Sequence, residues 1–151
     1  MHTTAEELLA QLRDLLRSVR MIKQRYADRS PVPLGHLGLL AQIDDGCHAR
    51  ELATRAGLDQ STVSRMVAAL VAHGLIERRL DPGDKRASCL AITPAGRAAL
   101  DEAQAWQSEV LGRALAGWTP DEVAALSAGI GRFTHNLDLI NGHHEILEAA
   151  R

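Results

Sequence analysis

The segment between residues 49 and 68 constrains the fold more than any other part of the chain. Its sequence, ARELATRAGLDQSTVSRMVA, places Gly57 between two short stretches whose apolar residues recur at helical spacing. A glycine at this point lets the first helix end with a positive φ, which other residues adopt only at a cost. Asp59 follows, and its carboxylate can cap the second helix. The segment therefore predicts two short helices joined by a tight turn, which is a helix-turn-helix.

The residues of this motif divide between an inner and an outer face. The side chains expected to make apolar contacts are Leu52, Ala56, Leu58, Val63, Met66, Val67 and Leu70. The polar side chains at the exposed beginning of the second helix are Gln60, Ser61, Thr62, Ser64 and Arg65. In a helix-turn-helix this part of the second helix enters the major groove, where Gln or Arg can hydrogen-bond base edges. We therefore expect these five residues to bind DNA; the alternative is a helical hairpin with a solvated polar face.

A basic hairpin is expected directly after this motif. Gly74 ends the second helix, and residues 76–80 and 88–92 are short strand-like runs separated by the turn DPGDKRA. The candidate DNA contacts in this hairpin are the cations Arg78, Arg79, Lys85 and Arg86. Cations in the turn can reach phosphates or a narrow minor groove, and those on the first strand would leave one or both beside the DNA backbone.

The charge distribution favours a local surface for a polyanion. The whole chain has a formal net charge of -2, but residues 48–93 hold seven Lys or Arg against five Asp or Glu. Beyond residue 93, four arginines face eight acidic residues. A net negative chain does not bind nucleic acid through bulk charge alone. The asymmetry therefore predicts one basic region flanked by scaffold.

Long amphipathic helices are expected on both sides of the basic region. Apolar residues recur at steps of three and four through residues 4–29, and the prolines at 31 and 33 end that helix. Thr93-Pro94 and the capping box at residues 119–122 open two further helices. Their apolar stripes are too long for one small core, so we expect them to pack against a second copy in a homodimer. A closed monomeric bundle is the alternative.

The expected fold is mainly α with a small β-hairpin wing, that is, a winged helix-turn-helix with a helical dimerisation region. We assign residues 1–33 to an N-terminal dimerisation helix, 34–93 to the winged lobe and 94–151 to C-terminal helices, within one structural domain. The start of the chain lacks the pattern of a signal peptide, and no run of eighteen apolar residues follows. We therefore expect a cytoplasmic, nucleoid-associated protein with no membrane contact.

The order of these motifs resembles the MarR family of bacterial regulators. The matching segments are the helix-turn-helix, Gly74-Leu75-Ile76-Glu77-Arg78, Asp84-Lys85-Arg86 and the LAITPAG run at residues 90–96. The resemblance implies a dimeric regulator whose two winged lobes read a pseudopalindromic site in double-stranded DNA, usually as a repressor relieved by a small ligand or by oxidation. It also implies that Asp84 orients Arg86 by a charge-assisted hydrogen bond. The alternative is that Asp84 is an exposed acid that favours the loop conformation.

The sequence constrains the effector least. The resemblance implies an aromatic acid near Arg20, Tyr26, His36 or Trp106, but residues of these types also serve as packing. The cysteine that the family uses near the start of the first helix for oxidation sensing is absent. Cys47 and Cys89 lack metal-ligand spacing, and we expect them to be reduced and structural, with a redox-responsive regulator as the alternative.

Other functional classes lack their motifs. No two of the seven histidines form a His-x-x-x-His pair, so we expect no metal and no cofactor, with a metal-responsive regulator of the same fold as the alternative. Neither Ser61 nor Cys47 lies in a nucleophile elbow, so the chain is not expected to be an enzyme. A winged helix that binds protein without DNA readout is a further possibility, and Lys85 and Arg86 argue against it.

Overall fold

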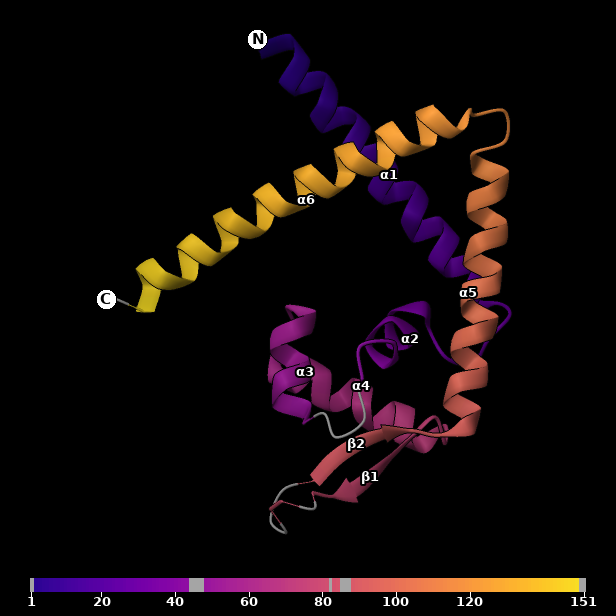
Figure 1. Cartoon of the computed structure of the whole chain (residues 1–151), viewed down its shortest axis with the longest axis vertical. Helices are drawn as coiled ribbons and strands as arrows, with labels where there is room; N and C mark the ends of the chain where they lie inside the picture. Colours follow the sequence, from indigo (N-terminus) through magenta and orange to yellow (C-terminus); the bar gives the residue numbers. More distant parts are fainter. Residues whose placement is uncertain (1, 44–47, 82, 85–87, 150–151) are drawn as a thin grey trace. The chain divides into compact units, whose positions relative to one another are not determined.

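The computed structural model describes residues 2–43, 48–81, 83–84 and 88–149, with side chains described from residue 4 to residue 142 outside the same gaps. Within these residues the elements follow in the order α1 (His2–Ala27), α2 (Leu34–Leu40), α3 (Ala49–Ala56), α4 (Gln60–Ala72), β1 (Ile76–Leu80), β2 (Ser88–Ile92), α5 (Pro94–Ala114) and α6 (Pro120–Ala149) (Figure 1). The mainly helical architecture with one small hairpin confirms the expected fold class. Two compact units, Met1–Trp106 and Gln107–Arg151, divide the chain.

The core of the first unit lies where α2, α3 and α4 meet the hairpin (Figure 1). Its fully buried side chains are Leu40, Leu52, Val63, Val67, Leu70, Ile76 and Leu90. Gly57 ends α3 with a φ of 63°, and its amide and that of Leu58 donate to the last carbonyls of the helix. The predicted turn between the two helices is therefore confirmed.

One side chain of the turn differs from expectation. Leu58 was expected among the apolar contacts of the helix-turn-helix, but it is 40% exposed. The turn explains the difference, because the backbone of Leu58 closes the end of α3 by hydrogen-bonding to Ala53 O. With its amide held there, the residue fills the turn and contributes only part of its side chain to the core.

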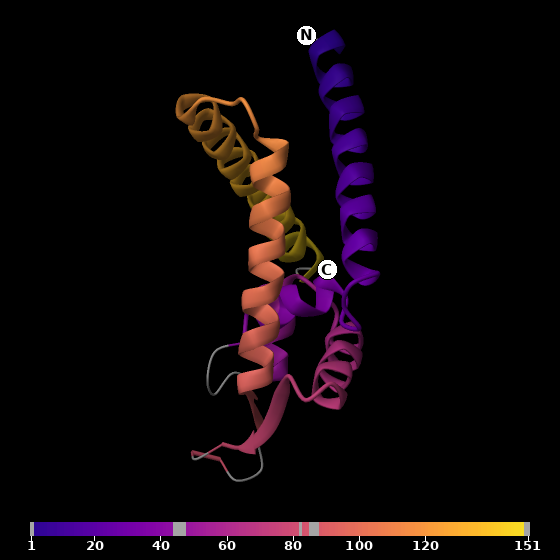
Figure 2. The same cartoon turned by 90° about the vertical axis from the view of Figure 1, so that its right-hand side faces the viewer.

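The two strands form an antiparallel hairpin with the predicted bounds. Ile76 pairs with Ile92 at one end, and Leu80 pairs with Ser88 at the other. β1 is buried only at Ile76, and its last residue, Leu80, is 72% exposed, whereas Cys89, Leu90 and Ala91 of β2 are buried. The hairpin leads directly into α5, as Figure 2 shows.

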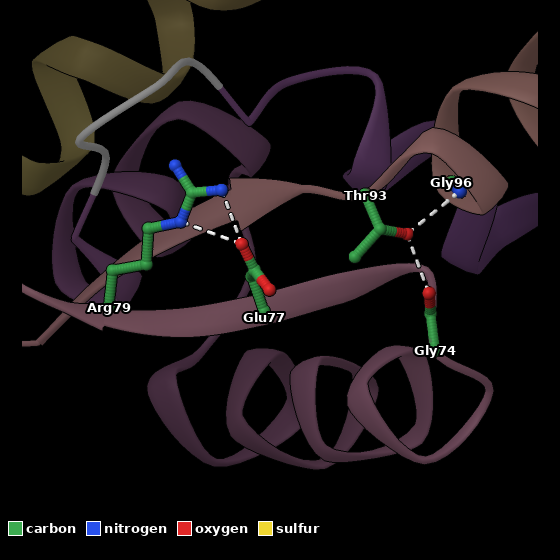
Figure 3. A network of polar contacts seen from close by, with 5 residues as sticks. All are labelled: Gly74, Glu77, Arg79, Thr93 and Gly96. Carbon is green, nitrogen blue, oxygen red and sulfur yellow. Dashed lines mark hydrogen bonds and ion pairs between the residues drawn. The ribbon is translucent and has the colours of Figure 1, made fainter.

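A single threonine joins the end of α4, the hairpin and α5 (Figure 3). Thr93 Oγ1 donates to Gly74 O at 2.6 Å and accepts from the amide of Gly96 at 3.1 Å. The amide of Thr93 donates to Leu75 O at 3.0 Å. This arrangement brings α5 so close to the preceding chain that a Cβ on Gly96 would overlap Leu75 O and lie 2.9 Å from Ile92 Cγ2. Glycine is therefore required at position 96 by space, not by φ.

The long helices contribute little to the cores of their own units. In the first unit Tyr26 of α1 packs on Trp106 of α5, with ring centroids 5.0 Å apart, while most of α1 is exposed. In the second unit the predicted capping box opens α6, because Glu122 accepts from the amide of Thr119 at 2.7 Å and Thr119 Oγ1 accepts from the amide of Glu122 at 3.3 Å. Up to residue 142, every side chain of α6 except that of Val123 is exposed.

Replacing Gly96 with alanine is expected to lower the free energy of unfolding by about 1–3 kcal/mol, because the new methyl group overpacks a backbone carbonyl that cannot move freely. Gly38→Ala is the matched control, since a Cβ there meets nothing within 4 Å. It should stabilise by about 0.5–1 kcal/mol because alanine favours helix. Urea unfolding followed by circular dichroism measures both variants. Equal stability of the two would contradict the close approach at Gly96.

Candidate nucleic-acid interface

The start of α4 presents a polar face to solvent. Gln60, Ser61, Ser64 and Arg65 are exposed and Thr62 is half-buried, whereas Val63 and Val67 on the other side of the helix are buried. The apolar side anchors the helix, and the polar side is free to contact a ligand over its first turns. These five residues lie together on one element, as the helical spacing predicted; their contact with DNA stays a prediction.

Asp59 organises the polar face. From its N-cap position it accepts the amide of Thr62 at 2.8 Å on Oδ1. Oδ1 also accepts from Ser61 Oγ at 2.5 Å, and Oδ2 accepts from Thr62 Oγ1 at 2.7 Å. The Ser61 hydroxyl, followed by the hydroxyl and amide of Thr62, holds the pKa of Asp59 well below its ordinary value of 3.8. Asp59 is therefore a carboxylate throughout the physiological pH range.

The cations of the hairpin do not all have the same surroundings. Arg79 forms an ion pair with Glu77 on the same face of β1, with Arg79 Nε 2.7 Å from Glu77 Oε1 (Figure 3). Arg78 is exposed on the opposite face of the strand and has no ion pair among the described residues. The charge of Arg78 is therefore less compensated than that of Arg79. Of the two strand arginines, Arg78 is the better candidate for a phosphate contact.

The turn of the hairpin carries the remaining predicted contacts. Lys85 and Arg86 lie outside the described residues, so their contacts with DNA stay predictions. Asp84 is described and exposed, and its support of Arg86 likewise stays a prediction.

His48 links the helix-turn-helix to the hairpin, and sequence reasoning did not find this role. The residue is the N-cap of α3. Its Nδ1 lies 3.1 Å from Ser88 O at the start of β2, and its Nε2 lies 3.0 Å from Asp81 Oδ2 at the end of β1. A neutral imidazole could donate to only one of these oxygens, whereas the imidazolium donates to both. No spacing in the sequence signals contacts across forty residues.

Asp81 gives this link a fixed acceptor. Its other carboxylate oxygen, Oδ1, accepts from the amide of Gly83 at 2.8 Å. That hydrogen bond is the largest cause that lowers the pKa of Asp81 below 3.8, and the nearby His48 lowers it further. The carboxylate therefore holds both the beginning of the turn and the imidazole. We call the contacts of His48 with Asp81 and Ser88 the His48 clasp.

The residues suggested for an effector are only partly brought together. Tyr26 and Trp106 contact each other and are 2% and 9% exposed, so they are core side chains. His36 is half-buried in α2, and Arg20 is exposed on α1. A ligand that reached the two rings would have to part them.

Redox sensing and metal sensing gain no support from the described residues. Cys89 is buried in β2 with its thiol free, and Cys47 lies outside the described residues. Across the described parts of the chain, no three His, Cys, Asp or Glu side chains gather in a way that could hold a metal ion. The same parts contain no helix with an apolar stretch of membrane-spanning length.

Replacing His48 with alanine is expected to loosen the far end of the hairpin, because Ser88 O and Asp81 lose a shared donor. Hydrogen exchange at the amides of residues 79–80 and 88–90 should accelerate by about 3- to 10-fold, the effect of one or two ordinary hydrogen bonds. His73→Ala is the control, since His73 is an exposed C-cap whose backbone makes its hydrogen bonds. Equal exchange in both variants and the wild type would show that the His48 clasp does not hold the hairpin.

Comparison with known proteins supports the interpretation of the lobe. A profile described as the MarR family matches residues 27–87, which run from the end of α1 to the turn of the hairpin. The HTH-type transcriptional regulator YxaD from Bacillus subtilis, itself uncharacterised, is 39% identical over 104 residues, covering 64% of this chain and 73% of YxaD.

Solved structures share the fold over most of the chain. A MarR family transcription regulator is 26% identical with a TM-score of 0.75, covering 91% of this chain and 95% of that protein. BpsR from Bordetella bronchiseptica, whose DNA binding is regulated by 6-hydroxynicotinic acid, is 23% identical with a TM-score of 0.68, covering 82% of this chain and 89% of BpsR. At that identity BpsR shows the fold alone. The profile, the curated relative and the winged lobe agree: the chain belongs to the MarR family and is a DNA-binding transcriptional regulator, not an enzyme.

Proposed function

We propose that this regulator binds a pseudopalindromic DNA site as a homodimer and represses transcription until a small molecule releases it. In this proposal the start of α4 enters the major groove, and the hairpin contacts the adjacent backbone or minor groove. The residues that read bases are Gln60, Ser61, Thr62, Ser64 and Arg65. Those that contact the backbone or minor groove are Arg78, Arg79, Lys85 and Arg86, with Asp84 supporting Arg86. The protein works in the cytoplasm, where its chromosomal target lies.

The observation that carries this proposal is the polar face of α4 above a fully buried apolar side. Ser61, Ser64 and Arg65 are exposed while Val63, Val67 and Leu70 anchor the helix. Arg65 is partly held in place, since its guanidinium lies 3.4 Å from Thr62 Oγ1. A rigid helix with short polar side chains at its beginning is suited to close approach to base edges.

The exposed apolar stripes support the homodimer. On α6 the exposed large apolar side chains at heptad-like spacing are Leu126, Ile130, Phe133, Leu137 and Ile140. On α1 the exposed large apolar side chains are Leu8, Leu9, Leu15, Leu16, Val19 and Met21. Exposed apolar patches on this scale mark interaction surfaces, and two-fold pairing lets each stripe be covered by its equivalent. A dimer also presents two winged lobes to two half-sites.

A small aromatic acid is the effector class that we propose. Support comes from BpsR, a relative in fold, whose DNA binding responds to 6-hydroxynicotinic acid. Arg20 would supply the cation for the carboxylate, with His36 as a polar neighbour. Tyr26 and Trp106 would contact the ligand only after their rings separate.

The protein is expected to sediment as a dimer at micromolar concentration. Phe133→Glu should shift it to monomer, because the substitution places a charge in the middle of the apolar stripe of α6. Ala128→Glu adds the same charge at an exposed position on the opposite face of the helix and should leave the dimer intact. Circular dichroism confirms that both variants stay helical. A monomeric wild type at tens of micromolar would remove the basis for a two-half-site operator.

Wild-type protein is expected to bind the intergenic DNA upstream of its own coding sequence more tightly than a scrambled duplex. Arg65→Ala should weaken binding to that site by about 1–3 kcal/mol for each lost base contact and change binding to the scrambled duplex little. Fluorescence anisotropy at two salt concentrations measures both affinities. Arg113→Ala, an exposed arginine at the end of α5, is the control. Equal losses on both duplexes in Arg65→Ala would mean that Arg65 contacts phosphate.

A further inference from the structure

Asp59 uses up the hydroxyl protons of its two neighbours on the polar face of α4. A hydroxyl has one proton to donate. Ser61 Oγ donates to Asp59 Oδ1 at an oxygen–oxygen distance of 2.5 Å, and Thr62 Oγ1 donates to Asp59 Oδ2 at 2.7 Å. An ionised carboxylate is an acceptor only, so it cannot reverse either hydrogen bond. The same donors stabilise the charged form of Asp59, which keeps this arrangement intact at neutral pH.

What each hydroxyl can still offer to DNA follows from this. Thr62 is half-buried, and its oxygen also lies 3.4 Å from the guanidinium of Arg65. Ser61 is exposed, and its oxygen retains lone pairs but no free proton. Ser61 can therefore accept a hydrogen bond from DNA and cannot donate one.

The groups of DNA that could contact Ser61 are either hydrogen-bond acceptors or hydrogen-bond donors, and Ser61 can bind only the donors. Phosphate oxygens, the N7 of purines, O6 of guanine and O4 of thymine are acceptors, which an acceptor-only hydroxyl cannot satisfy. The donors in the major groove are the exocyclic amino groups, N6 of adenine and N4 of cytosine. The negative charge of Asp59 beside Ser61 also disfavours a nearby phosphate.

We propose that Ser61 reads an exocyclic amino group of adenine or cytosine in the major groove, and that Asp59 is the positioning residue that imposes this choice. The inference rests on the proposed function for the docking of α4. It adds which chemical group one side chain of that helix recognises. A serine that contacts a phosphate must donate its hydroxyl proton to it. Ser61 already donates that proton to Asp59, so the proposal excludes a phosphate contact for Ser61.

The test begins with selection of a binding site by wild-type protein from a pool of random-sequence duplexes. Each adenine of the selected half-site is then replaced by purine, and each cytosine by pyrimidin-2-one, which removes the amino group alone. Anisotropy titrations should show at least one position per half-site where this removal weakens wild-type binding by about 3- to 10-fold, the effect of one neutral hydrogen bond. In Ser61→Ala the removal should lose its effect at one of these positions. In Ser108→Ala, a control at an exposed serine of α5 outside the proposed interface, it should weaken binding as in the wild type.

Asp59→Gly tests the positioning role without losing the helix start, since glycine at an N-cap costs little relative to aspartate. Removing the carboxylate frees the proton of Ser61, so the hydroxyl can donate as well as accept. The affinity ratio between the amino-bearing and amino-lacking duplexes should therefore fall in Asp59→Gly. A loss of the cap alone would weaken binding to both duplexes equally, and this result would overturn the role of Asp59.

The outcomes separate the inference from the proposed function. If the wild type selects no sequence from the pool, the docking of α4 is wrong and the inference falls with it. If the wild type selects a site but Ser61→Ala keeps the same sensitivity to amino removal, the inference alone is overturned. The inference alone is also overturned if replacing a guanine by 7-deazaguanine, which lacks the N7 acceptor, weakens binding by the wild type but not by Ser61→Ala.

Discussion

The arrangement of the winged lobe depends on the junction at Thr93. One hydroxyl bridges the turn after α4 and the first turn of α5, while the amide of the same residue binds Leu75 O at the base of the hairpin. The end of α4, the base of the hairpin and the first turn of α5 are therefore held together at one point. Because Gly96 leaves no room for a side chain there, the junction is a close contact between backbones and tolerates little adjustment. The positions of the candidate DNA contacts on α4 and β1 follow from this contact.

Local signals in the sequence predicted most of the fold. The strands have the predicted bounds, Gly57 adopts the expected positive φ, Gly74 follows the end of α4 as predicted, and the capping box at Thr119 forms. Each of these features depends on residues within a few positions of one another, which is the range over which backbone preferences and capping act. Leu58 was the exception, because its backbone closes the turn and leaves its side chain only partly covered.

Two kinds of contact in the candidate site were not predicted from the sequence. Some join residues far apart in the chain, and others are local pairs, such as Arg79 with Glu77, that occupy a side chain expected to contact DNA. The His48 clasp joins the start of α3 to both strands, and no periodicity connects these positions. The pairing of Arg79 with Glu77 separates two adjacent arginines that looked equivalent in the sequence. The sequence predicted that Ser61 and Thr62 bind DNA, but it did not predict that their hydroxyls donate to Asp59, which follows from the geometry of the cap. Helical spacing predicted which face these side chains share, but not the direction of their protons.

Because Cys89 is buried, chemical modification of its thiol reports opening of the hairpin. Cys89 is 6% exposed and pairs with Arg79 across the hairpin. Alkylation or oxidation requires a solvent-accessible thiolate, so a reagent can modify Cys89 only when the strand separates from the lobe. The rate of modification in excess reagent would then follow the equilibrium between closed and open wing. A buried thiol in this strand thus makes the wing slow to oxidise while it is folded, and marks permanently those molecules in which it has opened.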